Sequence, residues 1–212
     1  MTESEPEPVQ VHTTTLDVSE ERFAALLLTL AADELERAER FSFPEHRRRF
    51  VVARAFLRVV LGRALGLRPD RVLIELDARG KPQVDGTVRF NVAHSHELVV
   101  VALARGREVG IDLERLRPLS NRDALAQEVL APAERAALAS FPEERRDAAF
   151  LAAWTRKESY LKARGLGLAL PPREVVVELG EPAALVTDSA RWSLRSLSPA
   201  PGYVGAVTVE RG

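Results

Sequence analysis

The sequence predicts an α+β protein built as two related halves, each a small antiparallel sheet packed with a long helix. Short apolar runs typical of strands alternate with segments whose apolar residues recur at helical spacing. The chain also repeats itself: Glu36–Arg48 reads ERAERFSFPEHRR and Glu134–Arg146 reads ERAALASFPEERR, with nine of 13 positions identical at an offset of 98. We interpret this as an internal duplication whose halves face each other across a cleft, a favoured place for binding sites.

The first half is expected to span residues 9–105, after a tail of residues 1–8 whose Glu and Pro content predicts disorder. Its long helix covers Glu45–Leu65 and stops at Gly66, a residue typical of helix ends. Turn residues separate the predicted strands. The other expected elements are a strand at Val9–Thr15, a helix at Ala31–Phe41, and strands at Val72–Leu76, Val88–Val92 and Leu98–Ala104.

The second half, residues 106–212, repeats this order. Its long helix covers Arg145–Arg164 and stops at Gly165. The other expected elements are a strand at Val109–Leu113, helices at Ala124–Val129 and Pro132–Ser140, and strands at Glu174–Leu179, Ser193–Leu197 and Val204–Val209.

The composition excludes several classes of protein. With 30 cationic against 31 acidic residues, no excess charge drives binding to nucleic acid or to a membrane surface. The absence of Cys excludes disulfides, thiolate metal sites and Cys nucleophiles. The N-terminus is acidic and no run of 18 apolar residues occurs, so we expect a cytoplasmic protein without a secretory signal or membrane span.

Lysine is rare in this arginine-rich chain. Only Lys81, Lys157 and Lys162 are lysines among the 30 cations. A bias toward Arg that spared three positions by chance is one explanation. The other is that these sites require a compact ammonium group rather than a planar guanidinium.

Acidic residues in two segments suggest a metal site. In the predicted strand VGIDLE, Asp112 and Glu114 share one face because strand residues alternate. On the long helix, Glu158 and Lys162 are spaced i, i+4. Each pattern alone also fits a solvent-exposed surface. Together the three carboxylates suit Mg²⁺, and the lysine suits a phosphate held beside it.

A second group of residues suits an anion. The segment FNVAHSH ends a predicted strand, and His94 can hydrogen-bond a phosphate. A polar strand end is the alternative, and a zinc pair with His96 lacks a third ligand at recognisable spacing. Lys81 stands in a Gly-Lys-Pro turn, and arginines including Arg49 and Arg54 lie on the first long helix. No P-loop or dinucleotide-binding glycine motif is present.

Four motifs in this order resemble those of the Sfp-type 4′-phosphopantetheinyl transferases. The family patterns are G-K-P, F-N-x-S-H-S, G-[IV]-D-[IV]-E and W-[ST]-x-K-E-[AS]-x-x-K-x-x-G. The corresponding segments here are GKP at 80–82, FNVAHS at 90–95, GIDLE at 110–114 and WTRKESYLKARG at 154–165. The resemblance covers about residues 10 to 210. Ala93 departs from it, because the family usually has Ser there.

The resemblance implies a pseudo-twofold pair of halves that binds coenzyme A and Mg²⁺ in the cleft and transfers phosphopantetheine to a serine of an apo acyl, peptidyl or aryl carrier protein. It implies Asp112, Glu114 and Glu158 as metal ligands, and Glu158 or a metal-bound water as the base. It also implies that Lys162 stabilises phosphate charge. The implied contacts to coenzyme A come from Arg49, Arg54, Lys81, Pro82, His94, Lys157 and Lys162.

Two other functions remain open at this point. One is a catalytically inactive module of the same fold that binds a carrier protein or coenzyme A. The other is a Mg²⁺-dependent pyrophosphatase acting on free nucleotides. We expect a monomer, because the duplicated halves already supply the cleft. The sequence does not specify which carrier protein is served.

Overall fold

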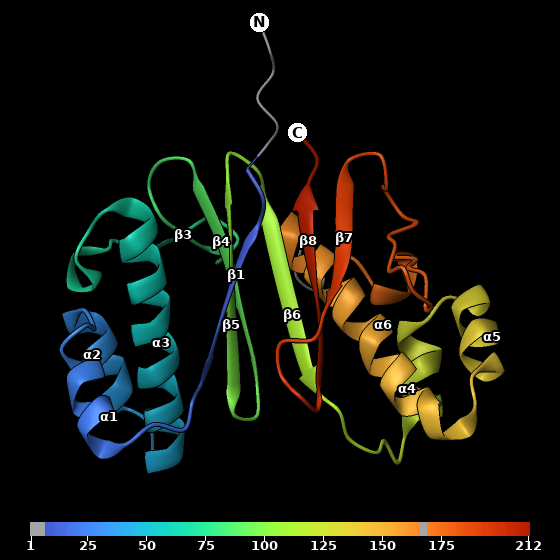
Figure 1. Ribbon diagram of the computed structural model, residues 1–212, viewed down its shortest axis with the longest axis horizontal. Helices are drawn as coiled ribbons and strands as arrows, with labels where there is room; N and C mark the ends of the chain where they lie inside the picture. The colour runs from blue at the N-terminus through green and yellow to red at the C-terminus, as the bar shows by residue number, and fades with distance from the viewer. Residues whose placement is uncertain (1–6, 166–168) are drawn as a thin grey trace, which may run out of the picture.

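The computed structural model describes residues 7–165 and 169–212, so most of the expected N-terminal tail lies outside the described residues. Two small antiparallel sheets stand side by side in the middle of the molecule, and helices cover them on the outer sides (Figure 1). The fold is therefore α+β, as predicted. None of the helices in the described ranges is both long and apolar enough to cross a membrane.

The first sheet has the strand order β1-β5-β4. The long helix α3 (Pro44–Leu65) lies beside it and ends at Gly66, which adopts a left-handed conformation. The other elements of this half are β1 (Gln10–Thr15), α1 (Glu20–Leu27), α2 (Ala32–Glu39), the 3-10 helix η1 (Pro69–Arg71), β2 (Glu75–Leu76), β3 (Pro82–Gln83), β4 (Val88–Ser95) and β5 (Leu98–Arg105).

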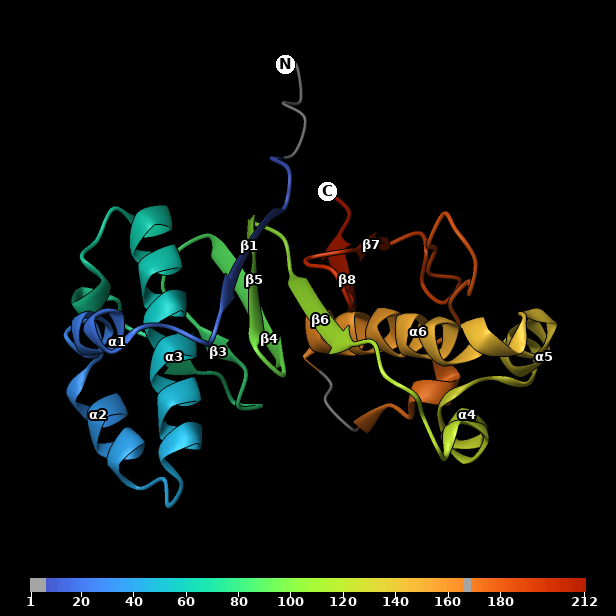
Figure 2. The same ribbon diagram turned by 60° about the horizontal axis from the view of Figure 1, so that its bottom comes forward.

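The second sheet has the strand order β6-β8-β7. The long helix α6 (Glu143–Arg164) packs against β6 and β8 and ends at Gly165, again in a left-handed conformation; in Figure 2 it runs below β7 and β8. The other elements are β6 (Val109–Arg115), α4 (Arg122–Val129), α5 (Pro132–Ser140), the 3-10 helix η3 (Pro172–Glu174), β7 (Trp192–Leu197) and β8 (Tyr203–Glu210).

Helix α6 and strand β6 approach each other at backbone distance. A Cβ atom added at Gly110 would lie 2.1 Å from the Ser159 carbonyl oxygen and 2.2 Å from the Ala163 nitrogen. Only glycine leaves room for this contact. Because Asp112 follows Gly110 on the strand, the contact determines which residues of α6 lie beside the predicted metal ligands.

An apolar core joins the two sheets. Ala93 and Val100 from the first sheet pack with Val109, Ile111 and Val207 from the second, all of them buried. Burial of this shared surface holds the halves together. Ala93, the departure from the family pattern, therefore contributes a methyl group to the core between the halves.

Equivalent buried contacts recur in both halves. In the first, Arg58 on α3 binds Glu34, and its Nη1 donates to the carbonyl oxygens of Pro69 and Val72. In the second, Lys157 on α6 binds Glu134 and the carbonyls of Pro172 and Val175. Both glutamates also accept the N–H of the residue that caps their short helix, Ala31 in one half and Ala131 in the other.

These contacts correct the register of the repeat. The match at offset 98 pairs Glu36 with Glu134, whereas the structure makes Glu34 the equivalent of Glu134. The equivalent contacts agree with the predicted duplication. The loop between the short and the long helix differs in length between the halves, so no single offset aligns both helices.

Most predicted elements are present with small shifts of their ends, two predicted strands are wrong or largely absent, and one helix was missed. Glu174–Leu179 is not a strand: it makes one isolated bridge, Val177 with Leu185. Only Glu75–Leu76 of the expected strand Val72–Leu76 forms. Helix α1 was not predicted. It begins with Ser19, whose side chain accepts the N–H of Arg22, a capping signal that could have revealed it.

Candidate active site

An ion pair between strand and helix forms the centre of the candidate site. Lys162 in the last turn of α6 donates from Nζ to Asp112 Oδ1 on β6, at 2.6 Å. Burial raises the pKa of Asp112 from 3.8 to about 6, against the lowering effect of Lys162, and the nearby charges of Glu158 and Glu114 raise it further. The site thus holds an acidic group that is costly to ionise without additional positive charge.

Two glutamates flank this pair. Glu158 precedes Lys162 by one turn of α6, and burial raises its pKa while Lys162 partly offsets the rise. Glu114 Oε2 on β6 accepts from Ser95 Oγ at 3.2 Å and from Arg117 Nη1 at 3.0 Å. The structure therefore brings the three predicted acidic residues to the same junction of β6 and α6.

A basic cavity opens in the first half, between α2, α3 and the end of β4. Its volume is about 630 Å³. Arg49 and His94, both predicted to bind an anion, line it. Arg37 and His46 line it as well and were not singled out from the sequence. The remaining lining residues are Leu16, Phe41, Phe50, Ala53, Ser95 and His96.

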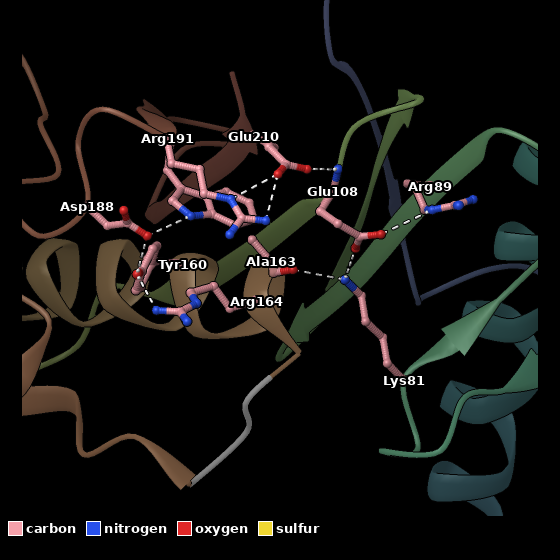
Figure 3. Close-up of polar contacts among 10 residues, drawn as sticks. Lys81, Arg89, Glu108, Tyr160, Ala163, Arg164, Asp188, Arg191 and Glu210 are labelled. Carbon is pink, nitrogen blue, oxygen red and sulfur yellow. Dashed lines mark hydrogen bonds and ion pairs between the residues drawn. The ribbon is translucent and has the colours of Figure 1, made fainter. Parts of the chain in front are cut away.

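Lys81 lies elsewhere, at the junction of the two halves (Figure 3). Its Nζ donates to Glu108 Oε2 at 2.7 Å and to the Ala163 carbonyl oxygen at 3.2 Å, so it reaches the end of α6. Arg89 binds the other oxygen of Glu108 at 3.1 Å. Lys81 lines a separate cavity of about 410 Å³, together with Arg79, Arg164 and Arg191. Pro82, its neighbour, pairs with Leu76 in the β2–β3 hairpin.

Comparisons with known proteins decide the family. Residues 16–105 match a profile described as 4′-phosphopantetheinyl transferase, N-terminal, and residues 108–208 match the 4′-phosphopantetheinyl transferase superfamily. Over 200 residues the chain is 44% identical to the 4′-phosphopantetheinyl transferase HetI of Nostoc sp., a match that covers 92% of this chain and 84% of that protein. This chain belongs to the 4′-phosphopantetheinyl transferase family.

Two further relatives carry the same description. A putative 4′-phosphopantetheinyl transferase of Synechocystis sp., slr0495, is 35% identical over 144 residues, covering 66% of this chain and 58% of that protein. The 4′-phosphopantetheinyl transferase ffp of Bacillus subtilis is 25% identical over 200 residues, covering 92% of this chain and 88% of that protein. The family resemblance inferred from the motifs is confirmed, and the chain is an enzyme of the transferase class.

Lys157 of this transferase does not have the predicted role. It is 0% exposed, and its Nζ lies 2.6 Å from Glu134 Oε2, with the carbonyls of Pro172 and Val175 as further acceptors. A buried ammonium that is fully bonded to the protein cannot reach a phosphate of coenzyme A. The prediction of Lys157 as a coenzyme A ligand is therefore wrong, and its role is structural.

Arg54 is half-buried and pairs with a buried glutamate. Its Nε binds Glu34, the buried glutamate that Arg58 shares, and Arg54 is not among the residues that line the basic cavity. Its side chain is 24% exposed, so Arg54 as a coenzyme A contact stays a prediction, with a guanidinium that already neutralises part of the Glu34 charge.

The acidic residues of the transferase fit a hard divalent cation by donor chemistry. They offer only carboxylate oxygens, which Mg²⁺ prefers, and Asp112 interacts electrostatically with both glutamates. Across residues 7–165 and 169–212, no three acidic or histidine side chains stand close enough to form a ready-made metal site. In this structure Asp112 Oδ1 is bonded to Lys162 and Glu114 Oε2 to Ser95 and Arg117.

Proposed function

We propose that this transferase moves the 4′-phosphopantetheine arm of coenzyme A to a serine of an apo acyl, peptidyl or aryl carrier protein, and releases adenosine 3′,5′-bisphosphate. It does so as a monomer. The observation that carries the proposal is the junction of β6 and α6, where Asp112 and Glu158 have raised pKa values beside Lys162. Carboxylates of this kind serve as proton acceptors and cation ligands in phosphoryl transfer.

The basic cavity supports the binding of coenzyme A. Arg49 and His94 supply donors to a phosphate group, and Arg37 and His46 add two more on the same wall. Phe41 and Phe50 give the cavity an apolar surface, which suits the rest of a nucleotide. Arg49 is now paired with Glu97 at 2.6 Å and is half exposed, so a phosphate can compete for it.

In the reaction the serine oxygen of the carrier protein forms a bond to the β-phosphorus of the pyrophosphate, and the bond from that phosphorus to the bridging oxygen breaks. The serine proton passes to Glu158, whose burial raises its pKa and makes it a better base near neutral pH. Lys162 places an ammonium beside the developing negative charge.

Asp112, Glu114 and Glu158 are the residues that would hold Mg²⁺. When bound, the ion supplies positive charge that neutralises the pyrophosphate. Without it the three carboxylates repel one another, which is one cause of the raised pKa of Asp112. Lys162 beside Asp112 and Arg117 beside Glu114 then provide the compensating positive charge.

Coenzyme A is expected to bind more tightly in Mg²⁺ than in EDTA, because the cation and the pyrophosphate share the charge of the acidic residues. The gain should shrink for Asp112→Ala and Glu158→Ala, with the larger loss at Asp112, the more deeply buried residue. Titration calorimetry on the parent and both variants measures it. Equal affinity under all conditions would contradict the metal assignment and the mechanism built on it.

Lys162→Ala is expected to lower kcat about 100-fold while the fold is retained. Lys162 itself is partly exposed, but Asp112, left behind, is buried. Burial already raises the pKa of Asp112 to about 6, so this carboxylate can take up a proton once its cation is gone, and the fold should survive with a moderate loss of stability. Steady-state transfer assays and thermal unfolding separate the two effects. Turnover within threefold of the parent would make Lys162 a surface ion-pair residue only.

Mass spectrometry tests the overall reaction. The parent is incubated with coenzyme A, Mg²⁺ and a panel of apo acyl, peptidyl and aryl carrier proteins, and the gain of one phosphopantetheine on the carrier is measured. Hydrolysis of coenzyme A without any carrier would instead favour a pyrophosphatase, and no modification of any carrier would contradict the proposal.

A further inference from the structure

The two halves meet along a pair of edge strands that no backbone ladder joins. Among the described strands, β4 pairs only with β5 in its sheet, and β6 only with β8. Side chains bridge the pair instead. Asn91 Oδ1 accepts from the Ile111 N–H at 2.9 Å, and Ser95 Oγ accepts from the Arg115 N–H at 3.1 Å. Both bridges join residues 20 apart, so the strands run parallel and in register.

The first bridge is buried. Asn91 is 8% exposed and Ile111 is 0% exposed, so water does not readily replace the carboxamide oxygen. Beyond the two ends of β6, the backbone hydrogen bonds to the neighbouring segment involve even-numbered residues: the Glu210 N–H donates to the Glu108 carbonyl and the Leu116 N–H to the Gly202 carbonyl. In an antiparallel pair the hydrogen-bonded residues alternate, so the even-numbered residues of β6 are the ones that bond to β8. The N–H of Ile111 therefore points away from the sheet and needs a side-chain acceptor.

The bridges enclose the residues that the proposed chemistry uses. On β6, Asp112 and Glu114 lie between the two bridged amides of Ile111 and Arg115. On β4, His94 lies between the two bridging side chains and lines the basic cavity. Ser95 has a further contact, because its hydroxyl lies 3.2 Å from Glu114 Oε2.

We propose that Asn91 and Ser95 are positioning residues that hold the strand bearing Asp112 and Glu114 in register with the strand bearing His94. This inference rests on the proposed function, since it assumes that the basic cavity and the acidic residues act on one coenzyme A molecule. A coenzyme A molecule held by both the basic cavity and the acidic residues reacts only if these two groups of residues keep a fixed spacing. A displacement of about 1 Å can cost about 100-fold in rate.

Asn91→Ala removes the first bridge without touching the basic cavity. We expect kcat for transfer to fall at least about tenfold, while the KM for coenzyme A stays within threefold because Arg49 and His94 are unchanged. Amide hydrogen exchange at Ile111 should accelerate at least about tenfold, since its acceptor is gone, with the amides of β5 and α3 unaffected.

Two variants at Ser95 keep the inference testable if the Asn91→Ala variant fails to fold. Ser95→Ala removes the second bridge and the contact with Glu114 at a half-buried position, and should lower kcat and expose the Arg115 amide. Ser95→Thr keeps the hydroxyl and should restore both. Thr187→Ala is the matched control: Thr187 Oγ1 accepts the Val176 N–H at 2.8 Å, the same kind of bond far from the acidic residues, and its loss should leave kcat unchanged.

Four outcomes overturn the inference. If the parent is active and the Ile111 amide still exchanges slowly in Asn91→Ala, the hydrogen bond to Asn91 does not protect that amide. Faster exchange with kcat within threefold of the parent makes the bridge structural only, as does an equal loss of kcat in Thr187→Ala. A parent that transfers nothing and binds coenzyme A no better with Mg²⁺ overturns the proposed function together with the positioning role, and is thereby distinguishable from the other three.

Discussion

Lys157→Ala is expected to lower the free energy of unfolding by about 3–5 kcal/mol, the usual cost of removing one partner of a buried ion pair. Glu134, left behind, is 3% exposed and would keep its charge in the core without a cation. The carbonyl oxygens of Pro172 and Val175 would lose their donor as well. Chemical denaturation of the parent and the variant measures the loss.

Lys162→Ala is the natural control, because both lysines belong to the same helix and motif. Lys162 is partly exposed, and Asp112 can take up a proton once this lysine is gone, so its removal should cost less stability than the removal of Lys157 while turnover falls. The two variants should therefore show opposite phenotypes. If Lys157→Ala unfolds like the parent and instead weakens coenzyme A binding, the structural role of Lys157 is wrong.

Asp112→Asn is expected to abolish transfer and to stabilise the metal-free protein at alkaline pH. The loss of a charged metal ligand should cost about 1,000-fold in kcat, since a bound cation supplies several kcal/mol of charge stabilisation. The gain in stability has a separate cause: burial raises the pKa of Asp112 from 3.8 to about 6, so ionisation is less favourable in the folded state.

The pH dependence follows from that direction. A raised carboxyl pKa destabilises the fold once the group must ionise, so the penalty is absent below about pH 4, grows between pH 4 and 6, and is complete above pH 7. A rise from 3.8 to about 6 corresponds to at most about 3 kcal/mol. Chemical unfolding of the parent and of Asp112→Asn in EDTA at pH 8 and pH 4 tests this. The variant should have the larger free energy of unfolding only at pH 8.

Mg²⁺ should reduce the difference between parent and Asp112→Asn, because it binds and stabilises the folded parent. An Asn variant that is less stable than the parent at pH 8 in EDTA would show that the pair with Lys162 outweighs the burial of the carboxylate.

Periodicity and capping residues were enough to predict every α-helix except α1, and most strands. Pro132 begins α5 as expected, and Gly66 and Gly165 end the long helices. The strand predicted at Glu174–Leu179 failed because side chains occupy its backbone groups. Lys157 binds the Val175 carbonyl, and Glu134 Oε1 accepts the Val177 N–H. Likewise, Arg58 donates a hydrogen bond to the Val72 carbonyl oxygen, so only the end of the strand predicted at Val72–Leu76 forms.

The relative placement of two candidate site residues could be predicted where both lie on one strand or one helix. Asp112 and Glu114 share a strand, and Glu158 and Lys162 share a helix face. Lys157 was not predictable, because it lies five residues before Lys162, about 140° around the helix, and a sequence does not reveal which side faces the core. Arg37 and His46 were missed because nothing local distinguishes them from the other charged residues on α2 and α3.

The scarcity of lysine makes the amines of this chain useful as chemical reporters. Each of the three lysines is bound to one carboxylate, with side chains 16% exposed at Lys81, 0% at Lys157 and 31% at Lys162. An amine-selective acylating reagent applied to the native protein should therefore label Lys162 first, Lys81 more slowly and Lys157 only after unfolding. The labelling rate at Lys162 reports on the candidate site, and the labelling rate at Lys157 reports on global unfolding of the chain.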